Sequence, residues 1–87
     1  MKEYKVVLSL EASIGLKDAT KLSQSSILAY LHYLKSNPFD EGDFVSIPDD
    51  NEREYFVKGI RKHLVSYLPD HASKEVRVTS ITKNKKA

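Results

Sequence analysis

The spacing of apolar residues changes twice along this 87-residue chain, and that change limits the possible folds more than any other feature. Apolar and polar residues alternate over residues 4–10, which is the period of a strand with one buried face. Between residues 16 and 34, apolar side chains recur at intervals of three and four, which places them on one side of a helix. Residues 55–81 return to alternation. The sequence therefore predicts a strand, a helical region and further strands, which is an α+β domain.

The helical region contains two apolar stripes with polar residues between them. The stripes are formed by Leu16, Ala19 and Leu22, and then by Ile27, Tyr30, Leu31 and Leu34. Residues 23–26, Ser-Gln-Ser-Ser, separate them and are candidates to cap a second helix. The region is either two helices or one long helix kinked near Ser25. It ends at Asn37-Pro38, because proline disfavours the helical conformation in the residue before it.

A long acidic connection follows over residues 38–52. It contains Asp40, Glu41, Asp43, Asp49 and Asp50. Within it, residues 44–47 are apolar enough to form a short extended piece, and residues 49–51 have the composition of a turn.

The last third of the chain predicts three strands, over residues 55–60, 63–68 and 75–81. Tight turns near Arg61-Lys62 and over residues 69–73 join them, and residues 83–87 are expected to be a frayed basic tail. The chain then forms one domain over residues 1–87, of order β-α-α-β-β-β. We expect the helices on one face of a small, mainly antiparallel sheet. The neighbour of the first strand in that sheet stays open.

The residue types that are absent exclude several classes of protein. The chain has no Cys, which excludes a disulfide-stabilised scaffold, a thiolate zinc site and a cysteine nucleophile. Its histidines (His32, His63 and His71) show no metal-ligand spacing, and its three Gly are scattered rather than gathered in a phosphate-binding loop. No signal peptide is visible, and no apolar run approaches the ~18 residues of a membrane span. We expect a cytoplasmic protein without a metal, a cofactor or a membrane contact.

The net charge of +2 conceals an asymmetry between the two parts of the chain. The first 52 residues hold five Lys and nine Asp or Glu, whereas residues 53–87 hold nine Lys or Arg and three Asp or Glu. A basic part of this size indicates a polyanionic or acidic partner.

Six basic residues are the candidates for nucleic-acid contact: Arg53, Lys58, Arg61, Lys62, Arg77 and Lys83. On a regular strand, the odd-numbered residues 77–83 share one face, opposite Val76 and Val78. With Lys58 on that face too, the sheet would present a concave basic surface, and Tyr55 or Tyr67 would lie near enough to stack on a base. The alternative is a solvated sheet face without a ligand.

This arrangement resembles the RelE/ParE toxin superfamily over nearly the whole chain. The resemblance is carried by Arg53-Glu-Tyr-Phe-Val-Lys-Gly-Ile-Arg-Lys-His-Leu-Val-Ser-Tyr67, by Val76-Arg-Val-Thr-Ser-Ile81 and, upstream, by Leu34-Lys-Ser-Asn-Pro-Phe-Asp-Glu-Gly42. It implies the toxin of a type II toxin–antitoxin pair, of the kind associated with plasmid stabilization. The cognate antitoxin protein that the resemblance implies is expected to be acidic, with an amphipathic helix.

The resemblance also implies a mode of action. RelE-like members inhibit translation by ribosome-dependent mRNA cleavage, in which the 2′-hydroxyl of the RNA attacks and basic side chains stabilise the phosphate. Arg53, Lys58, Arg61, Arg77 and Lys83 would bind that phosphate. The acid would be His63, because the segment 82–87 has no Tyr, His or Arg. A ParE-like, non-catalytic inhibitor of DNA gyrase and a non-toxic interaction domain of the same fold are the alternatives.

Overall fold

Two separate helices follow the first strand, because a threonine starts the second one. The structure is a computed structural model that describes residues 3–46 and 54–84. Helix α1 (Leu10–Asp18) begins after Ser9, whose Oγ accepts the N–H of Ala12 at 3.0 Å. Helix α2 (Lys21–Ser36) begins after Thr20, whose Oγ1 accepts the N–H of Ser23 at 3.2 Å. The alternative of one helix kinked near Ser25 is therefore wrong, and the expected caps at 23–26 lie inside α2.

The strands form one mainly antiparallel sheet, with the order β1-β5-β4-β3-β2. Their bounds are β1 Lys5–Leu8, β2 Phe44–Ser46, β3 Tyr55–Ile60, β4 His63–Asp70 and β5 Glu75–Lys83. The first strand, whose neighbour the sequence left open, pairs in parallel with β5, and the pairs β5–β4, β4–β3 and β3–β2 are antiparallel. The predicted α+β order is confirmed, and the short extended piece expected near residue 44 is the edge strand β2.

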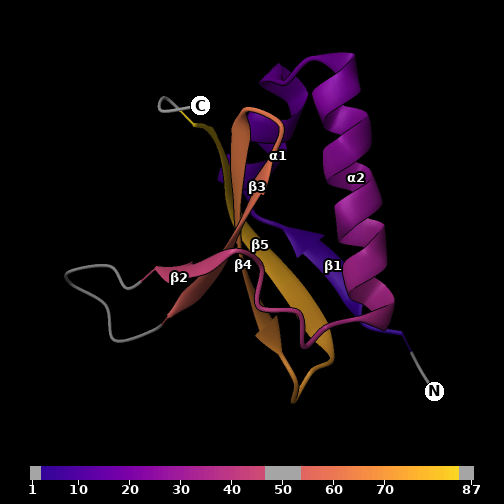
Figure 1. Ribbon diagram of the computed structural model, residues 1–87. Helices are drawn as coiled ribbons and strands as arrows, with labels where there is room; N and C mark the ends of the chain where they lie inside the picture. The colour runs from indigo at the N-terminus through magenta and orange to yellow at the C-terminus, as the bar shows by residue number, and fades with distance from the viewer. Residues whose placement is uncertain (1–2, 47–53, 85–87) are drawn as a thin grey trace.

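Both helices lie on one side of this sheet, as Figure 1 shows. Their apolar stripes and the inward side chains of the strands form a single core: Ala12, Ile27, Leu31, Leu34, Ile60, Val65, Tyr67, Val76, Val78 and Ile81. Helix α1 crosses β5 so closely at Gly15 that there is no room for a side chain there, because the nearest atoms belong to the backbone of Ile81. Among the described residues, no helix is long and apolar enough to cross a membrane.

A register shift changes which residues of β5 face the helices. Tyr67 lies opposite Val78, but Ser66 lies opposite Ser80, so Thr79 is an extra residue in β5. The bulge reverses the alternation after it, and Ile81 joins Val78 in the core. The prediction that residues 77, 79, 81 and 83 share one face is therefore wrong. Arg77 lies on the uncovered face, and Lys83, two residues after buried Ile81, lies on the face that the helices cover.

Several predicted boundaries shift for local reasons. Leu10 was expected to continue the first strand, but the Ser9 cap makes it the first residue of α1, where it is 79% exposed. Pro69 and Asp70 were predicted in a turn but extend β4, opposite Val76 and Glu75. Lys83, predicted as the start of the tail, is the last residue of β5. The turn predicted at 49–51 and the tail residues 85–87 lie outside the described residues.

Candidate nucleic-acid interface

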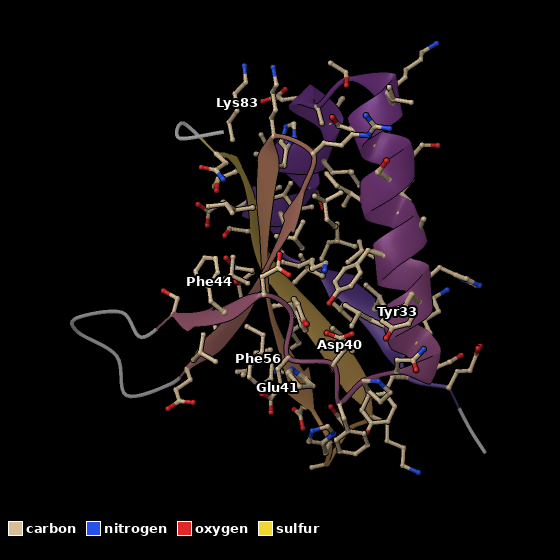
Figure 2. All side chains as sticks on the ribbon, in the orientation of Figure 1. Tyr33, Asp40, Glu41, Phe44, Phe56 and Lys83 are labelled. Atoms are coloured by element: carbon tan, nitrogen blue, oxygen red, sulfur yellow. The ribbon has the colours of Figure 1, made fainter. Side chains whose placement is uncertain are left out.

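A two-residue turn between β3 and β4 brings basic side chains to one end of the sheet. Arg61 and Lys62 form this turn, with Ile60 opposite His63 in the register. Lys83 lies opposite His63 on the other side, and the N–H of Asn84 donates to the carbonyl of Lys62 at 2.7 Å. Figure 2 shows Lys83 at this end of the molecule, far from Tyr33 and Asp40. We call Arg61, Lys62, His63 and Lys83 the hairpin cluster.

Arg61 occupies an unusual backbone conformation in this turn. Its φ is +54°, in the left-handed region where Gly and Asn are favoured and other residues are uncommon. Its Nε donates to Oγ of Ser26 on α2 at 2.8 Å. The hydrogen bond holds the guanidinium against the helix, while the remaining N–H groups of the fork stay available to a second acceptor.

Lys58 lies opposite buried Val65, so it shares the helix-covered face rather than the predicted uncovered one, and its ammonium is engaged away from the turn. Its Nζ lies 3.1 Å from Oδ1 of Asp43 and 5.6 Å from the ring centre of Tyr30. The other carboxylate oxygen of Asp43 accepts the N–H of Gly59 at 2.8 Å. The Gly59 N–H and then Lys58 hold the pKa of Asp43 below its usual value, because both favour the ionised form. A phosphate at Lys58 would therefore compete with a carboxylate.

The structure does not bring the remaining predicted residues to the hairpin cluster. Arg77 lies near the other end of β5 and forms ion pairs with Asp70 at 3.2 Å and Glu75 at 3.4 Å. Arg53 lies outside the described residues. The single concave surface that the sequence predicted is thus divided, and only Arg61, Lys62 and Lys83 gather around His63.

Neither of the two tyrosines that the sequence proposed for base stacking is placed to stack on a base at the hairpin cluster. Tyr67 has no exposed surface, so its ring has no room to stack on a base. Tyr55, opposite Ser46 in the sheet, follows the alternation of the uncovered face. His63 shares the helix-covered face with Tyr67, and its Nδ1 is buried without a hydrogen-bond partner among the described residues. Those residues also contain no cluster of three acidic or histidine side chains able to hold a metal ion.

A tyrosine–aspartate network at the C-terminal part of α2 was not expected from the sequence. The carboxylate of Asp40 accepts the hydroxyls of Tyr30 at 3.1 Å and Tyr33 at 2.9 Å, and the N–H of Gly42 at 2.7 Å. The hydroxyl of Tyr67 donates to the carbonyl of Asp40 at 2.7 Å and lies 2.9 Å from the hydroxyl of Tyr30. Burial raises the pKa of Tyr67 to about 12 and also raises the pKa of Tyr30, so both phenols remain protonated. The network fixes the connection between α2 and β2. In the sequence, the only sign of this network is that Tyr30 and Tyr33 are three residues apart and so lie on the same face of a helix.

Acidification is expected to destabilise the protein through Asp40 and Asp43. Their pKa values lie below the usual 3.8, chiefly because the N–H groups of Gly42 and Gly59 donate to them. A carboxyl group whose pKa is lower in the folded state stabilises above its unfolded pKa, and this stabilisation is lost as the pH falls through the folded pKa. Urea unfolding midpoints should therefore decrease below about pH 5. The double variant Asp40→Asn, Asp43→Asn should show a flatter decrease, and a slope equal to that of the parent would contradict this assignment.

A separate groove of about 690 Å³ opens at the opposite end of the sheet. It is lined by Glu3, Tyr4, Tyr33, Lys35, Ser36, Asn37, Pro38, Phe39, Asp40 and Lys74. Phe39 is 73% exposed and stacks on His71, with ring centres 4.6 Å apart. None of the described candidate residues for nucleic-acid contact lines this groove.

Comparison with known proteins gives matches in structure alone. No family model matches the chain, and no curated protein matches it in sequence. A chain of the archaeal RelE–RelB complex from Pyrococcus horikoshii superposes with a TM-score of 0.76 at 15% identity, covering 98% of this chain and 99% of that one. The isolated RelE toxin of E. coli gives a TM-score of 0.77 at 15% identity, with 97% and 87% covered. A chain of the toxin–antitoxin complex RelBE2 from Mycobacterium tuberculosis gives 0.73 at 16% identity, with 93% and 98% covered. The chain therefore has the RelE-like toxin fold that the resemblance implied.

Proposed function

We propose that the chain is the toxin of a toxin–antitoxin pair and that it inhibits translation by ribosome-dependent mRNA cleavage at the hairpin cluster. The observation that carries the proposal is that the β3–β4 turn places Arg61, Lys62 and His63 beside Lys83, within a RelE-like fold. Arg61 supplies one positive charge at this turn, and its hydrogen bond to Ser26 holds the guanidinium against α2. Lys62 and Lys83 add two further positive charges around it.

The cluster supplies the parts that cleavage of an RNA phosphodiester needs. The 2′-hydroxyl of the RNA gives its proton to solvent and its oxygen forms a bond to phosphorus, while the bond from phosphorus to the 5′-oxygen breaks, which leaves a 2′,3′-cyclic phosphate. Arg61, Lys62 and Lys83 would stabilise the negative charge that develops on the phosphoryl oxygens. His63 would give its proton to the departing 5′-oxygen. The proposed partners are the ribosome with its mRNA and a cognate antitoxin.

The replacement Arg61→Gly separates the role of this side chain from that of the turn. Glycine suits a φ of +54°, so the variant should fold as stably as the parent, whereas growth arrest on expression in a bacterial host should be lost. Lys74→Gly is the matched control, because Lys74 is also basic, has a φ of +57° and lies in the turn at the other end of β5. Growth curves and the positions of mRNA breaks give the readout. Arrest that persists in Arg61→Gly, or is lost equally in Lys74→Gly, would refute the role of the cluster.

The variant His63→Gln tests the catalytic step by itself. It should abolish mRNA breaks at the ribosomal A site while binding of a single-stranded RNA to the purified protein stays within about threefold, because the three cations remain. Breaks at the parental rate would exclude His63 as the acid. Arrest with intact mRNA and altered plasmid topology would instead favour inhibition of gyrase, and growth without any arrest would favour a non-toxic interaction domain.

A further inference from the structure

The edge strand β2 presents uncharged, partly apolar residues to solvent. All three of its residues are exposed, with Phe44 at 50% and Val45 at 42%. Among the described residues, β2 has a strand neighbour on one side only, which is β3. The N–H and C=O groups along such an edge can pair with another strand. Natural edges are protected by shortness, by charge, by Pro or by bulges; β2 is short, with three residues, but Phe44, Val45 and Ser46 carry no charge.

The approach to β2 is held in place before any partner binds. Asp40 is tied to α2 through Tyr30 and Tyr33, and its carbonyl accepts the hydroxyl of Tyr67. Two residues before β2, Gly42 adopts a φ of +69°, and its N–H donates to the carboxylate of Asp40. Asp43 is fixed by Gly59 and Lys58. A strand that adds to this edge would meet an ordered template, so less conformational entropy is lost on binding.

Carboxylates flank both ends of this edge. Glu41 and Asp43 precede β2, and Glu54 directly precedes Tyr55, which lies opposite Ser46. Figure 2 shows Glu41, Asp40 and Phe44 along this part of the molecule. Lys58 offsets one of these charges through its ion pair with Asp43. The surroundings of β2 are therefore acidic, unlike the hairpin cluster.

We propose that the edge of β2 that faces away from β3, which has no strand neighbour among the described residues, binds an extended segment of a partner protein as an added strand. This segment has an apolar centre with Lys or Arg on both sides. The apolar centre would cover Phe44 and Val45, and the flanking cations would pair with Glu41 and Glu54. A nucleic acid does not fit this surface, because its phosphates would face the carboxylates. A second copy pairing β2 with β2 would bring the same carboxylates together, which is repulsive. The inference goes beyond the proposed function and does not depend on toxin activity.

Two peptides that differ only in charge test the proposal on the intact protein. The probe is the capped heptapeptide Lys-Lys-Val-Ile-Val-Lys-Lys, and its control is Glu-Glu-Val-Ile-Val-Glu-Glu. Amide hydrogen exchange at residues 44–46 should slow with the lysine peptide, and the glutamate peptide should bind about tenfold or more weakly. Slowed exchange with a single-stranded RNA, equal binding of both peptides, or no protection by either would overturn the proposal. Concentration-dependent dimers that protect β2 would overturn it in favour of self-association.

Variants of the edge test whether the peptide binds at β2 rather than elsewhere on the protein. Val45→Lys places a cation on the strand and should weaken the lysine peptide about tenfold, because like charges then face each other. Ile14→Lys on α1 is the matched control, since Ile14 is also apolar and is 52% exposed. Glu41→Lys should weaken the lysine peptide and strengthen the glutamate peptide. Binding that is unchanged in both edge variants would place the site elsewhere. Since the readout is binding, failure of this proposal leaves the growth-arrest test of the hairpin cluster unaffected.

Discussion

Replacing Gly15 with alanine is expected to lower the free energy of unfolding by about 3 kcal/mol or more. The added Cβ would overlap the carbonyl oxygen of Ile81 and lie 2.9 Å from its carbonyl carbon. Both atoms belong to the backbone of β5, which is held by pairing to β4 and β1, so neither moves away cheaply. For a domain of this size the melting temperature should fall by about 12–24 °C.

The control for this prediction lies on the same helix. Ser13→Ala introduces the same residue at an exposed position of α1 and should change the free energy of unfolding by less than about 0.5 kcal/mol. Thermal melts of both variants, followed by circular dichroism, provide the comparison. A melting temperature of Gly15→Ala within a few degrees of the parent would show that α1 does not pack against β5 as closely as described.

Removing the hydroxyl of Tyr67 is expected to have the second largest effect, a loss of about 1–3 kcal/mol in the free energy of unfolding. Tyr67 is fully buried, and its hydroxyl donates to the carbonyl of Asp40 and contacts the hydroxyl of Tyr30. The variant Tyr67→Phe keeps the ring but leaves that carbonyl without this donor, in a place that the phenyl ring keeps from water. The connection leading to β2 would then lose one of its attachments to the sheet and keep those that Asp43 makes to β3.

Tyr33→Phe is the matched comparison for this variant. Tyr33 also donates to Asp40, at 2.9 Å, but its side chain is 45% exposed and water can replace the lost hydrogen bond. Tyr33→Phe should therefore lower the free energy of unfolding by clearly less than Tyr67→Phe. If urea denaturation gives the same loss in the free energy of unfolding for both variants, burial does not make the Tyr67 hydroxyl more important for stability than the Tyr33 hydroxyl. Faster amide exchange over residues 40–44 in Tyr67→Phe alone would confirm that the network orders this connection.

Much of the fold followed from local pattern. The alternating residues of β3 and β4 and the three-and-four spacing of Ile27, Leu31 and Leu34 predicted elements that the structure contains. The break between the helices was misplaced, because four polar residues at 23–26 looked like caps while a single hydroxyl, that of Thr20, makes the cap. Serine is compatible with both a cap and the interior of a helix, so composition did not separate the two places.

The candidate site was predicted less well, for a reason that lies in β5. Alternation from Arg77 to Lys83 assumed a regular strand, and the extra residue at Thr79 reverses the faces beyond it. One inserted residue is enough to turn every later side chain of a strand over. The ion pairs of Arg77 with Asp70 and Glu75 depend on the turn that brings the end of β4 next to the start of β5. The ion pair of Lys58 with Asp43 depends on the pairing of β2 with β3, because Asp43 directly precedes β2.

By itself, the sequence determined the α+β class, the order of the elements and the basic character of the C-terminal part, because period and charge are properties of neighbouring residues. Only the tertiary structure decided that β1 joins β5 in parallel, that Lys83 lies beside the Arg61–His63 segment, and that three tyrosines hold Asp40. These contacts join residues far apart in the chain, such as Tyr30 and Tyr67 or Asn84 and Lys62. They are fixed by the register of the strands and by the bulge in β5, which no local spacing specifies.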